Sequence, residues 1–337
     1  MKKIKIAQIG TSQNSHGNDI WKTLIKLPDV FEIVGYALPQ NERRLFPNKM
    51  KAFEGYREMT VDEILSDPEI EAVAVETQEP YLTKYAIMVA KAGKHLHMEK
   101  PGGMCLDEFK ELISILKENN LVFSTGYMYR FNPMVRAALD KIKRGELGKI
   151  YSVEAQMNCT HDKALRDWLA SFPGGMLFFL GCHLIDLVYQ IQGEPCEVIP
   201  LSCSTGIDGV NSMDCGMAVF KYPSGVSFIK ACDVERGGFE RRQLVICGEK
   251  GTIEIKPLEV VVHGGQVTRS REVYDLEWYQ PHPEVESEIY DRYIDMIRNF
   301  AELIHGKENP YSYDYELGLY ELILKACGKE NQKAARI

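Results

Sequence analysis

A lysine and its neighbours are the first residues in this sequence whose types and spacing could do chemistry. Lys100 follows a short apolar run, and Pro101 keeps the chain extended at the lysine. We therefore expect Lys100 at the carboxyl end of a buried strand, where open parallel sheets bind their ligands. An ammonium group at that edge can stabilise a developing negative charge. The alternative is a surface turn with a solvated lysine.

The second candidate is His183, which lies in an apolar segment predicted to be a helix over 176–191. Asp186 follows on the same helix and could orient the imidazole, and Phe179 is expected one turn earlier on the same face. A histidine among such apolar neighbours is either a satisfied core residue or a general base. The helix alone leaves both interpretations open.

A third candidate is the loop after the first predicted strand, residues 4–9. Gly10 ends that strand and precedes a helix, where a dinucleotide pyrophosphate would bind at the helix N-terminus. Of the G-x-G-x-x-G fingerprint only Gly10 matches, and Ser12 and Ser15 occupy the other two glycine places. Four loop residues are expected to contact the cofactor: Gly10, Thr11, Ser12 and Asn14. The alternative is an ordinary strand-to-helix loop.

The end of the second predicted strand, residues 31–37, carries no acidic residue. Such an acid would accept the ribose hydroxyls of NAD, and Leu38 cannot. The change also removes a charge that would repel a 2′-phosphate. Arg43 and Arg44 lie close behind and could reach such a phosphate, unless they are solvated helix residues. The sequence therefore leaves NAD and NADP both open.

The elements that must position these residues follow two patterns. Residues 1–124 alternate strands with helices, which predicts a parallel sheet with right-handed crossovers. After Gly126 we expect a helix over 133–142, a strand over 150–157 and a charged loop over 159–172. Strands with short turns then run from 198 to about 273, which favours a largely antiparallel sheet. Two helices, roughly 284–305 and 315–327, are expected to close the chain.

These patterns predict an α/β protein with two domains. Residues 1–124 form a Rossmann dinucleotide-binding domain, and residues 125–337 form a C-terminal α/β domain with an open, mostly antiparallel sheet. The net charge of −8 gives no electrostatic case for nucleic acid, and no apolar run is long enough to span a bilayer. Nine scattered cysteines, never spaced as CxxC, are typical of reduced thiols in a cytoplasm. We expect no metal site.

Several motifs together resemble the Gfo/Idh/MocA family, named after glucose–fructose oxidoreductase and inositol dehydrogenase. The motifs are Glu99-Lys100-Pro101, the stretch from Gly126 to Pro133, and Gly174-Gly175 before Gly181-Cys182-His183-Leu184-Ile185-Asp186. The resemblance covers nearly the whole chain. It implies a nicotinamide cofactor, NAD or NADP, and a sugar or cyclitol substrate. It also implies a homo-oligomer, dimer or tetramer, formed through the exposed face of the C-terminal sheet.

The resemblance also implies residue roles. Lys100 would hydrogen-bond the reacting hydroxyl, and His183 would exchange its proton. The residues expected at the cofactor, besides the loop, are Leu38, Thr77, Glu99 and Lys100. The residues expected at the substrate are Arg130, Asn132 and Asp186.

Three departures from the family pattern accompany these roles: Phe179 in place of an aspartate, Leu38, and the degraded glycine loop. The leading hypothesis is an NAD(P)-dependent oxidoreductase acting on a sugar, cyclitol or related polyol. A variant of it uses transient oxidation to allow elimination from a glycoside. The alternative is a binding protein of the same fold without turnover. The substrate, the direction of reaction and the oligomer size do not follow from the sequence.

Overall fold

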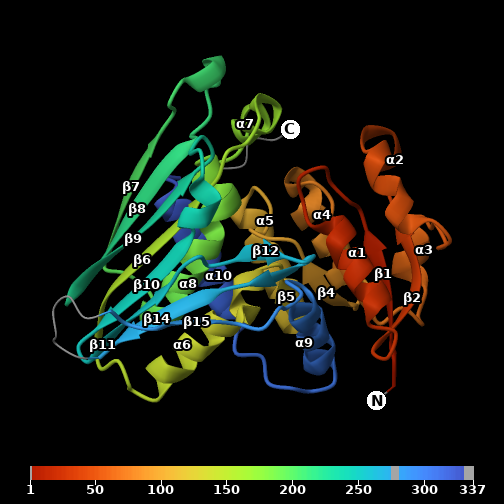
Figure 1. Ribbon diagram of the computed structural model, residues 1–337. Coiled ribbons are helices and arrows are strands. Elements are labelled where there is room, and N and C mark those ends of the chain that lie inside the picture. Colours follow the sequence, from red (N-terminus) through yellow and green to blue (C-terminus); the bar gives the residue numbers. More distant parts are fainter. Residues whose placement is uncertain (1, 275–280, 330–337) are drawn as a thin grey trace. The chain divides into compact units, whose positions relative to one another are not determined.

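The computed structural model describes residues 2–274 and 281–329, which divide into two compact units (Figure 1). The first unit contains residues 2–127 and 293–320. Among the described residues, the second contains 128–292 without its gap, and 321–329. The sequence-based division assigned residues 293–320 to the second domain, whereas in the structure they pack with the first unit. The predicted fold class, a Rossmann domain followed by a domain with a mostly antiparallel sheet, is confirmed.

The first unit is built on a five-stranded parallel sheet with the order β2-β1-β3-β4-β5. Its strands are β1 (Ile4–Ile9), β2 (Phe31–Ala37), β3 (Ala72–Val75), β4 (His95–Met98) and β5 (Phe123–Thr125). The chain builds β2 on one side of β1 and then crosses to build β3 on the other side. The carboxyl ends of β1 and β3 therefore form a topological switch point, the place where open α/β sheets bind ligands.

Helices surround this sheet where the sequence supplies their start signals. They are α1 (Gly17–Lys26), α2 (Glu42–Leu45), α3 (Val61–Ser66), α4 (Glu79–Lys91), α5 (Leu106–Glu118), α9 (Ile294–Ile304) and α10 (Tyr313–Ala326), with the 3-10 segment η1 (Pro47–Phe53). Thr60 and Glu63 form a capping box at the start of α3. Pro80 lies in the first turn of α4, where its missing N–H costs nothing. Phe300 of α9 contacts the ring of His97 on β4, at 5.8 Å between centroids.

The second unit is built on an eight-stranded sheet with the order β15-β14-β11-β10-β6-β9-β8-β7. The strands are β6 (Ile150–Asn158), β7 (Glu197–Cys203), β8 (Cys215–Tyr222), β9 (Gly225–Cys232), β10 (Gln243–Gly248), β11 (Gly251–Ile255), β14 (Arg269–Val273) and β15 (Glu284–Glu286). Every neighbouring pair is antiparallel except β6 with β9. A separate hairpin pairs β12 (Val260–Val262) with β13 (Gly265–Val267).

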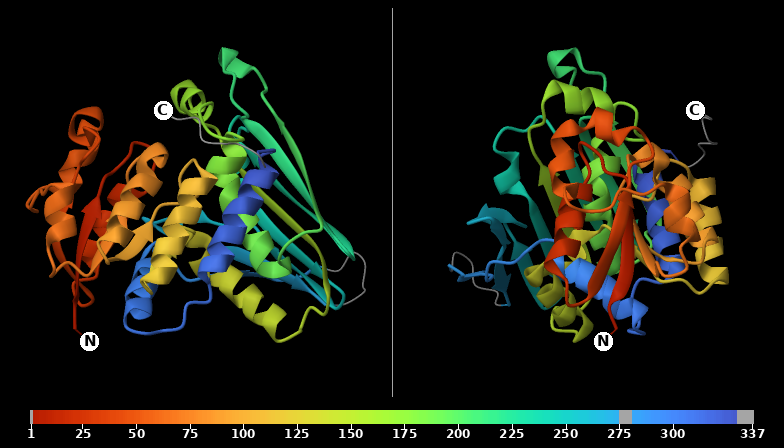
Figure 2. Two further views of the ribbon diagram at one scale, coloured as in Figure 1. Left: turned by 180° about the vertical axis from the view of Figure 1, so that it is seen from behind. Right: turned by 90° about the vertical axis from the view of Figure 1, so that its right-hand side faces the viewer.

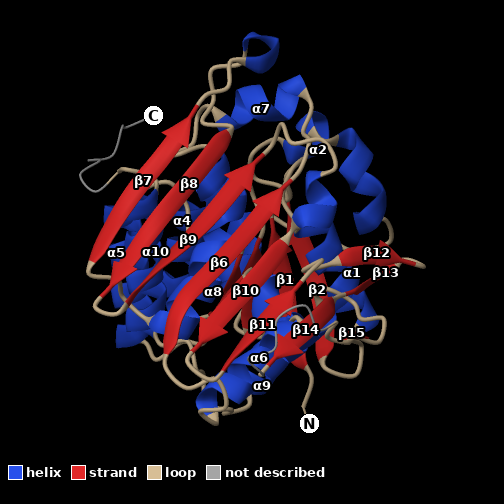
Figure 3. Cartoon of the chain, turned by 60° about the vertical axis from the view of Figure 1, so that its left-hand side comes forward, coloured by secondary structure: helices blue, strands red, loops and turns tan. Residues whose placement is uncertain are grey.

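One face of the large sheet carries the helices of the second unit, and the other is open (Figures 2 and 3). The helical segments are η2 (Met128–Phe131), α6 (Pro133–Lys143), α7 (Lys163–Leu169), a π-helical turn η3 (Leu177–Gly181), α8 (Cys182–Gln192), η4 (Ile207–Gly209) and η5 (Gly238–Arg241). Alternate residues such as Val153 and Phe220 are fully buried, whereas Leu201 is 54% exposed on the open face. Period-2 alternation therefore sorts the sheet into a core face and an open face.

Two sequence-based expectations were wrong in this region, and a third, a helix over 176–191, is confirmed with a local difference. The charged stretch 159–172 is not all loop, because Asp162 caps α7 by accepting a hydrogen bond from Leu165 N. Residues 284–286 form the edge strand β15, paired with β14 through contacts such as Arg269 with Glu286, and the helix begins only at Ile294. The apolar helix expected over 176–191 begins with a π-helical turn before α8.

Candidate functional site

The loop between β1 and α1 forms a cradle around Gly10 at the switch point. Gly10 has φ +83°, and a Cβ added there would lie 2.5 Å from Thr77 Cβ, so only glycine fits. Gln8 Nε2 ties the loop together, because it donates to Gly10 O and Gly17 O at 3.0 Å each. Helix α1 begins at Gly17. A glycine cradle beside a helix N-terminus suits a dinucleotide pyrophosphate.

The hydroxyl groups of the loop are used to stabilise the loop itself. Thr11 Oγ1 donates to Asn18 Oδ1 at 2.9 Å, and Asn14 N donates to Ser12 Oγ at 3.3 Å. Ser15 Oγ donates to Glu76 O at 3.4 Å. The backbone amides are therefore the phosphate donors that this loop would offer, with the hydroxyls in a supporting position.

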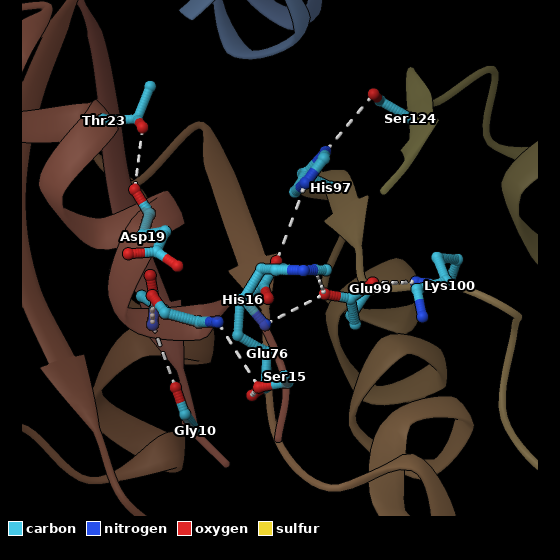
Figure 4. A network of polar contacts seen from close by, with 12 residues as sticks. Gly10, Ser15, His16, Asp19, Thr23, Glu76, His97, Glu99, Lys100 and Ser124 are labelled. Atoms are coloured by element: carbon cyan, nitrogen blue, oxygen red, sulfur yellow. Dashed lines mark hydrogen bonds and ion pairs between the residues drawn. The ribbon is translucent and has the colours of Figure 1, made fainter. Parts of the chain in front are cut away.

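Lys100 lies immediately beyond β4, at the same edge of the sheet as the glycine cradle. Its side chain is 2% exposed, and its peptide bond to Pro101 is cis. Lys100 N donates to Glu99 Oε1 at 2.8 Å (Figure 4). The ammonium group acts electrostatically on Glu76, Glu79 and Glu99, and it favours the ionised form of each. A buried cation surrounded by carboxyl groups is thus fixed at the ligand edge.

Glu99 is ionised and held by two neighbours. Its Oε2 accepts hydrogen bonds from His16 N at 3.3 Å and pairs with His16 Nδ1 at 3.0 Å (Figure 4). Burial alone would raise the pKa of Glu99, but the charge and hydrogen bond of His16 and the Lys100 ammonium hold it at about 2. Glu99 therefore carries a negative charge beside Lys100 at every physiological pH.

Glu76 and His97 form a buried pair beneath the loop. His97 Nε2 lies 3.6 Å from Glu76 Oε1, and His97 Nδ1 lies 3.3 Å from Ser124 Oγ (Figure 4). Within the described residues, neither carboxyl oxygen of Glu76 has a hydrogen-bond partner. Burial raises the pKa of Glu76 well above its ordinary range and lowers the pKa of His97 to about 4. Burial thus favours the protonated form of Glu76, the form that would not repel a phosphate.

The start of α2, shortly after β2, contains a carboxyl group that the sequence analysis missed. Glu42 is fully buried, and its oxygens accept from Gln40 N at 2.6 Å and from Thr77 Oγ1 at 3.1 Å. Glu42 thus lies four residues beyond Leu38, which is half-buried at the expected place. Arg43, the expected 2′-phosphate ligand, already donates to Tyr36 Oη at 3.1 Å and pairs with Glu58.

His183 of the second unit is buried against Tyr129, whose hydroxyl group is held by a hydrogen bond to Glu259. The two rings of Tyr129 and His183 lie 5.3 Å apart between centroids and are perpendicular. Tyr129 Oη donates to Glu259 Oε1 at 2.6 Å, and Glu259 also accepts from Arg242 and Arg292 at 3.0 Å each. Burial and the neighbouring Glu259 raise the pKa of Tyr129, so its hydroxyl stays protonated. The network fixes a rigid wall for the imidazole.

The three residues expected at the substrate have structural partners. Arg130 donates to both oxygens of Asp186 at 2.8–3.2 Å, and Gln190 Nε2 also donates to Asp186, at 2.8 Å. Asn132 Oδ1 accepts from Met134 N and Val135 N, which caps α6.

The amide of Asn132 donates to Leu258 O and Tyr290 Oη. All four hydrogen-bonding positions of the Asn132 side chain are therefore used within the protein, and its contact with a substrate stays a prediction. Arg130 and Asp186 form a buried ion pair, and an orienting contact of Asp186 with His183 stays a prediction.

Phe179 lies in the π-helical turn that leads into α8, four residues before His183. Its ring meets Trp168 of α7 edge-on, at 5.5 Å between centroids, and is 7% exposed. Where the family resemblance implied an aspartate, this chain has an aromatic wall. The π-turn was not predictable from spacing, because its apolar residues also fit an α-helix.

Two site residues that the sequence analysis missed, Gln8 and Glu76, could have been found from one pattern in the sequence. Gln8 and Glu76 interrupt or end buried apolar strands, IKIAQI and AVAV, where a polar residue needs a reason. In residues 2–274 and 281–329, no group of three or more His, Cys, Asp or Glu side chains could hold a metal ion. No helix in that part of the chain combines the length and apolar character needed to cross a membrane.

Comparison with known proteins agrees with this geometry. Residues 4–127 match the family model described as an oxidoreductase family with an NAD-binding Rossmann fold. Residues 135–254 match the GFO/IDH/MocA C-terminal domain. A solved levoglucosan dehydrogenase, in complex with NADH and levoglucosan, superposes with a TM-score of 0.78 over 98% of both chains. At 18% identity that likeness concerns the fold.

Two curated relatives are similar over most of the chain. Trans-1,2-dihydrobenzene-1,2-diol dehydrogenase from Bos taurus is 27% identical over 64% of this chain, which spans 63% of that relative's length. Myo-inositol 2-dehydrogenase from Thermotoga maritima is 24% identical over 81% of both chains. The expectation of a nicotinamide dinucleotide cofactor is thereby confirmed at the level of the family. The chain belongs to the Gfo/Idh/MocA family of oxidoreductases, whose N-terminal domain is an NAD-binding Rossmann fold.

Proposed function

We propose that this chain is an NAD- or NADP-dependent dehydrogenase that acts on a ring hydroxyl of a sugar, cyclitol or related polyol. One observation supports this most strongly. A buried ammonium group, Lys100, lies at the same sheet edge as the glycine cradle. The two relatives are named as an inositol dehydrogenase and a dihydrodiol dehydrogenase, and both names denote a substrate with a ring that carries hydroxyls. The cytoplasmic location remains our expectation from the thiol pattern.

Oxidation of such a hydroxyl needs two tasks from the protein. When bound, the nicotinamide ring supplies the hydride acceptor. Lys100 would donate a hydrogen bond to the hydroxyl oxygen and stabilise the negative charge that develops there. His183 would accept the hydroxyl proton, and Tyr129 would keep its ring in place. The cradle around Gly10 would bind the pyrophosphate.

Replacing Lys100 by methionine tests the proposal. Lys100→Met keeps the aliphatic stem and removes the charge, so we expect the protein to fold and to bind NADH or NADPH in a fluorescence titration. Turnover of a substrate found by screening a polyol panel should fall at least ~100-fold, the usual effect of a positioned charge or proton donor. Lys91→Met is the matched control, because Lys91 is exposed and pairs only with Glu111 among its described contacts.

Two outcomes would decide against the proposal. Normal turnover in Lys100→Met would remove the lysine from the chemistry. A wild-type protein that binds neither reduced cofactor, and that turns over no polyol, would instead support a binding protein of the same fold.

A further inference from the structure

Three cysteines lie side by side on the open face of the eight-stranded sheet. Cys203 on β7 is the register partner of Cys215 on β8, and Cys215 is the register partner of Cys232 on β9. The three strands are neighbours on that face (Figure 3). Cys203 is exposed, Cys215 is half-buried and Cys232 is 5% exposed. All are free thiols.

The register determines which two thiols can bond. Asp233 N donates to Asp214 O at 3.0 Å, so residues 214 and 233 form a hydrogen-bonded pair. Hydrogen-bonded and non-hydrogen-bonded pairs alternate along antiparallel strands, which makes Cys215 and Cys232 a non-hydrogen-bonded pair. Side chains approach most closely in such pairs, with Cβ atoms near ~4.5 Å. A disulfide needs Cβ atoms about 3.5–4.5 Å apart.

The pair of Cys203 with Cys215 is of the other kind. Backbone groups of Cys215 that do not face β9 face β7, so Cys203 and Cys215 form a hydrogen-bonded pair with more widely separated side chains. Cys203 Sγ instead contacts the carbonyl oxygen of Cys215, at 3.6 Å. In contrast, burial and the neighbouring Cys232 together raise the pKa of the Cys215 thiol.

We propose that Cys215 and Cys232 are a redox-sensitive dithiol that a small disulfide, such as oxidised glutathione, converts to an intramolecular disulfide. The Cys215 thiolate attacks one sulfur of the oxidant, forming a mixed disulfide and releasing one glutathione thiolate. Cys232, after losing its proton, attacks the Cys215 sulfur and releases the second glutathione. Two protein thiols are oxidised and one small disulfide is reduced to two thiols, which take up the two protons.

The bond would form where the sheet meets the segment leading to His183. Asp214, next to Cys215, accepts from Thr205 N and Thr205 Oγ1 at 2.8 Å each. Met213 O accepts from Met176 N at 3.0 Å, one residue before the π-helical turn. A cross-link at Cys215 would therefore stiffen the strand end that contacts the start of this turn.

Peptide mapping of the full chain tests the proposal. Burial raises the pKa of Cys215 to about 11, so equilibration with oxidised glutathione is best done near ~pH 9, where more thiolate exists. The protein is then denatured with an alkylating reagent and digested without reduction. We expect one cross-linked species that joins the peptides of Cys215 and Cys232, two hydrogens lighter than their sum, within a monomer and lost on reduction.

Variants separate this bond from general thiol oxidation. Cys215→Ser should abolish the cross-link, whereas Cys203→Ser should preserve it. Cys247→Ser is the matched control, because Cys247 is also half-buried on the open face but its register partners are Ser152 and Thr252. Glutathione only on Cys203 or Cys196, or a bond of Cys232 to Cys159, would overturn the proposal. Each of these is read from wild-type protein, so a variant that fails to fold does not prevent the test.

Discussion

At the scale of one residue, the buried carboxyl group of Glu79 makes the stability of the protein depend on pH. Its carboxyl group lies at the start of α4, and burial raises its pKa from 4.5 to about 7. Because the folded-state pKa exceeds that of the unfolded chain, Glu79 costs no stability below pH 4.5. The cost grows as the pH rises from 4.5 to about 7 and is constant above.

Glu79→Gln should therefore stabilise the protein at alkaline pH alone. We expect a gain in the free energy of unfolding on the order of 3 kcal/mol at pH 8, and almost none at pH 4.5. Urea denaturation at the two pH values measures it. Glu111→Gln is the control, because Glu111 is exposed. An equal gain at both pH values would contradict a raised pKa of Glu79 in the folded protein.

Substitutions at Phe179 can distinguish a His183 that takes part in catalysis from a His183 that only packs in the core. An aspartate at this position would favour the protonated imidazole. If His183 is the base, the acid limb of the pH–rate profile of Phe179→Asp should move up by about one unit. Phe179→Asn introduces a side chain of the same size as aspartate but without its charge, and should leave the acid limb of the pH–rate profile in place. Identical profiles for the two variants would remove His183 from the proton transfer.

At the scale of one element, the β1–α1 loop makes a steric prediction. Gly10→Ala should raise the cofactor dissociation constant more than ~10-fold, because the new Cβ would force Gly10 away from Thr77 and distort the cradle. Gly55→Ala is the control, because it separates the strain of a side chain at positive φ from the clash of a Cβ with a neighbouring residue. Gly55 has a similar φ, +85°, but a Cβ there meets nothing within 4 Å. Calorimetric titration with NADH should therefore distinguish the two variants, and equal affinities would contradict the placement of the cofactor.

The elements could be predicted from sequence where local pattern decides them. Strands β1 and β3 are buried on both faces, so each contains a short apolar run that alternation with helices makes recognisable. Strand β15 was mistaken for helix, because an edge strand of three exposed residues has no apolar pattern.

The site was less predictable, because its partners are distant in sequence. Tyr129 pairs with Glu259 across 130 positions, and Arg130 pairs with Asp186 across 56. Spacing along the chain says nothing about which distant side chains meet. Motifs therefore placed Lys100 correctly beyond a strand, but they could not show that Asn132 is a helix cap.

At the scale of the whole molecule, we propose that the open sheet face joins copies of the chain into a dimer or tetramer, and that the thiols on this face, Cys203 and Cys215, are open to oxidised glutathione only in dissociated chains. Ile199, Leu201 and Val226 are 40%, 54% and 52% exposed on it. Leu201→Glu combined with Val226→Glu should lower the mass seen by light scattering to that of one chain. Val261→Glu, on the hairpin β12–β13 and 59% exposed, should not. A monomeric wild type would end the proposal.

The discontinuity of the first unit has a consequence for how the protein is made. The strands of its sheet are complete at Thr125, yet α9 and the first part of α10 belong to the same unit. Contacts such as Thr125 Oγ1 with Glu316 Oε1, and Tyr320 Oη with Gly103 O, close loops of 191 and 217 residues.

On the ribosome, the five strands therefore emerge long before the helices that complete their unit. The whole eight-stranded sheet is synthesised in between, and it can fold while the earlier unit waits with part of its apolar surface uncovered. Closing such long loops slows folding. During translation this protein should depend on whatever shields nascent apolar surface in the cell until the chain reaches α9 and α10.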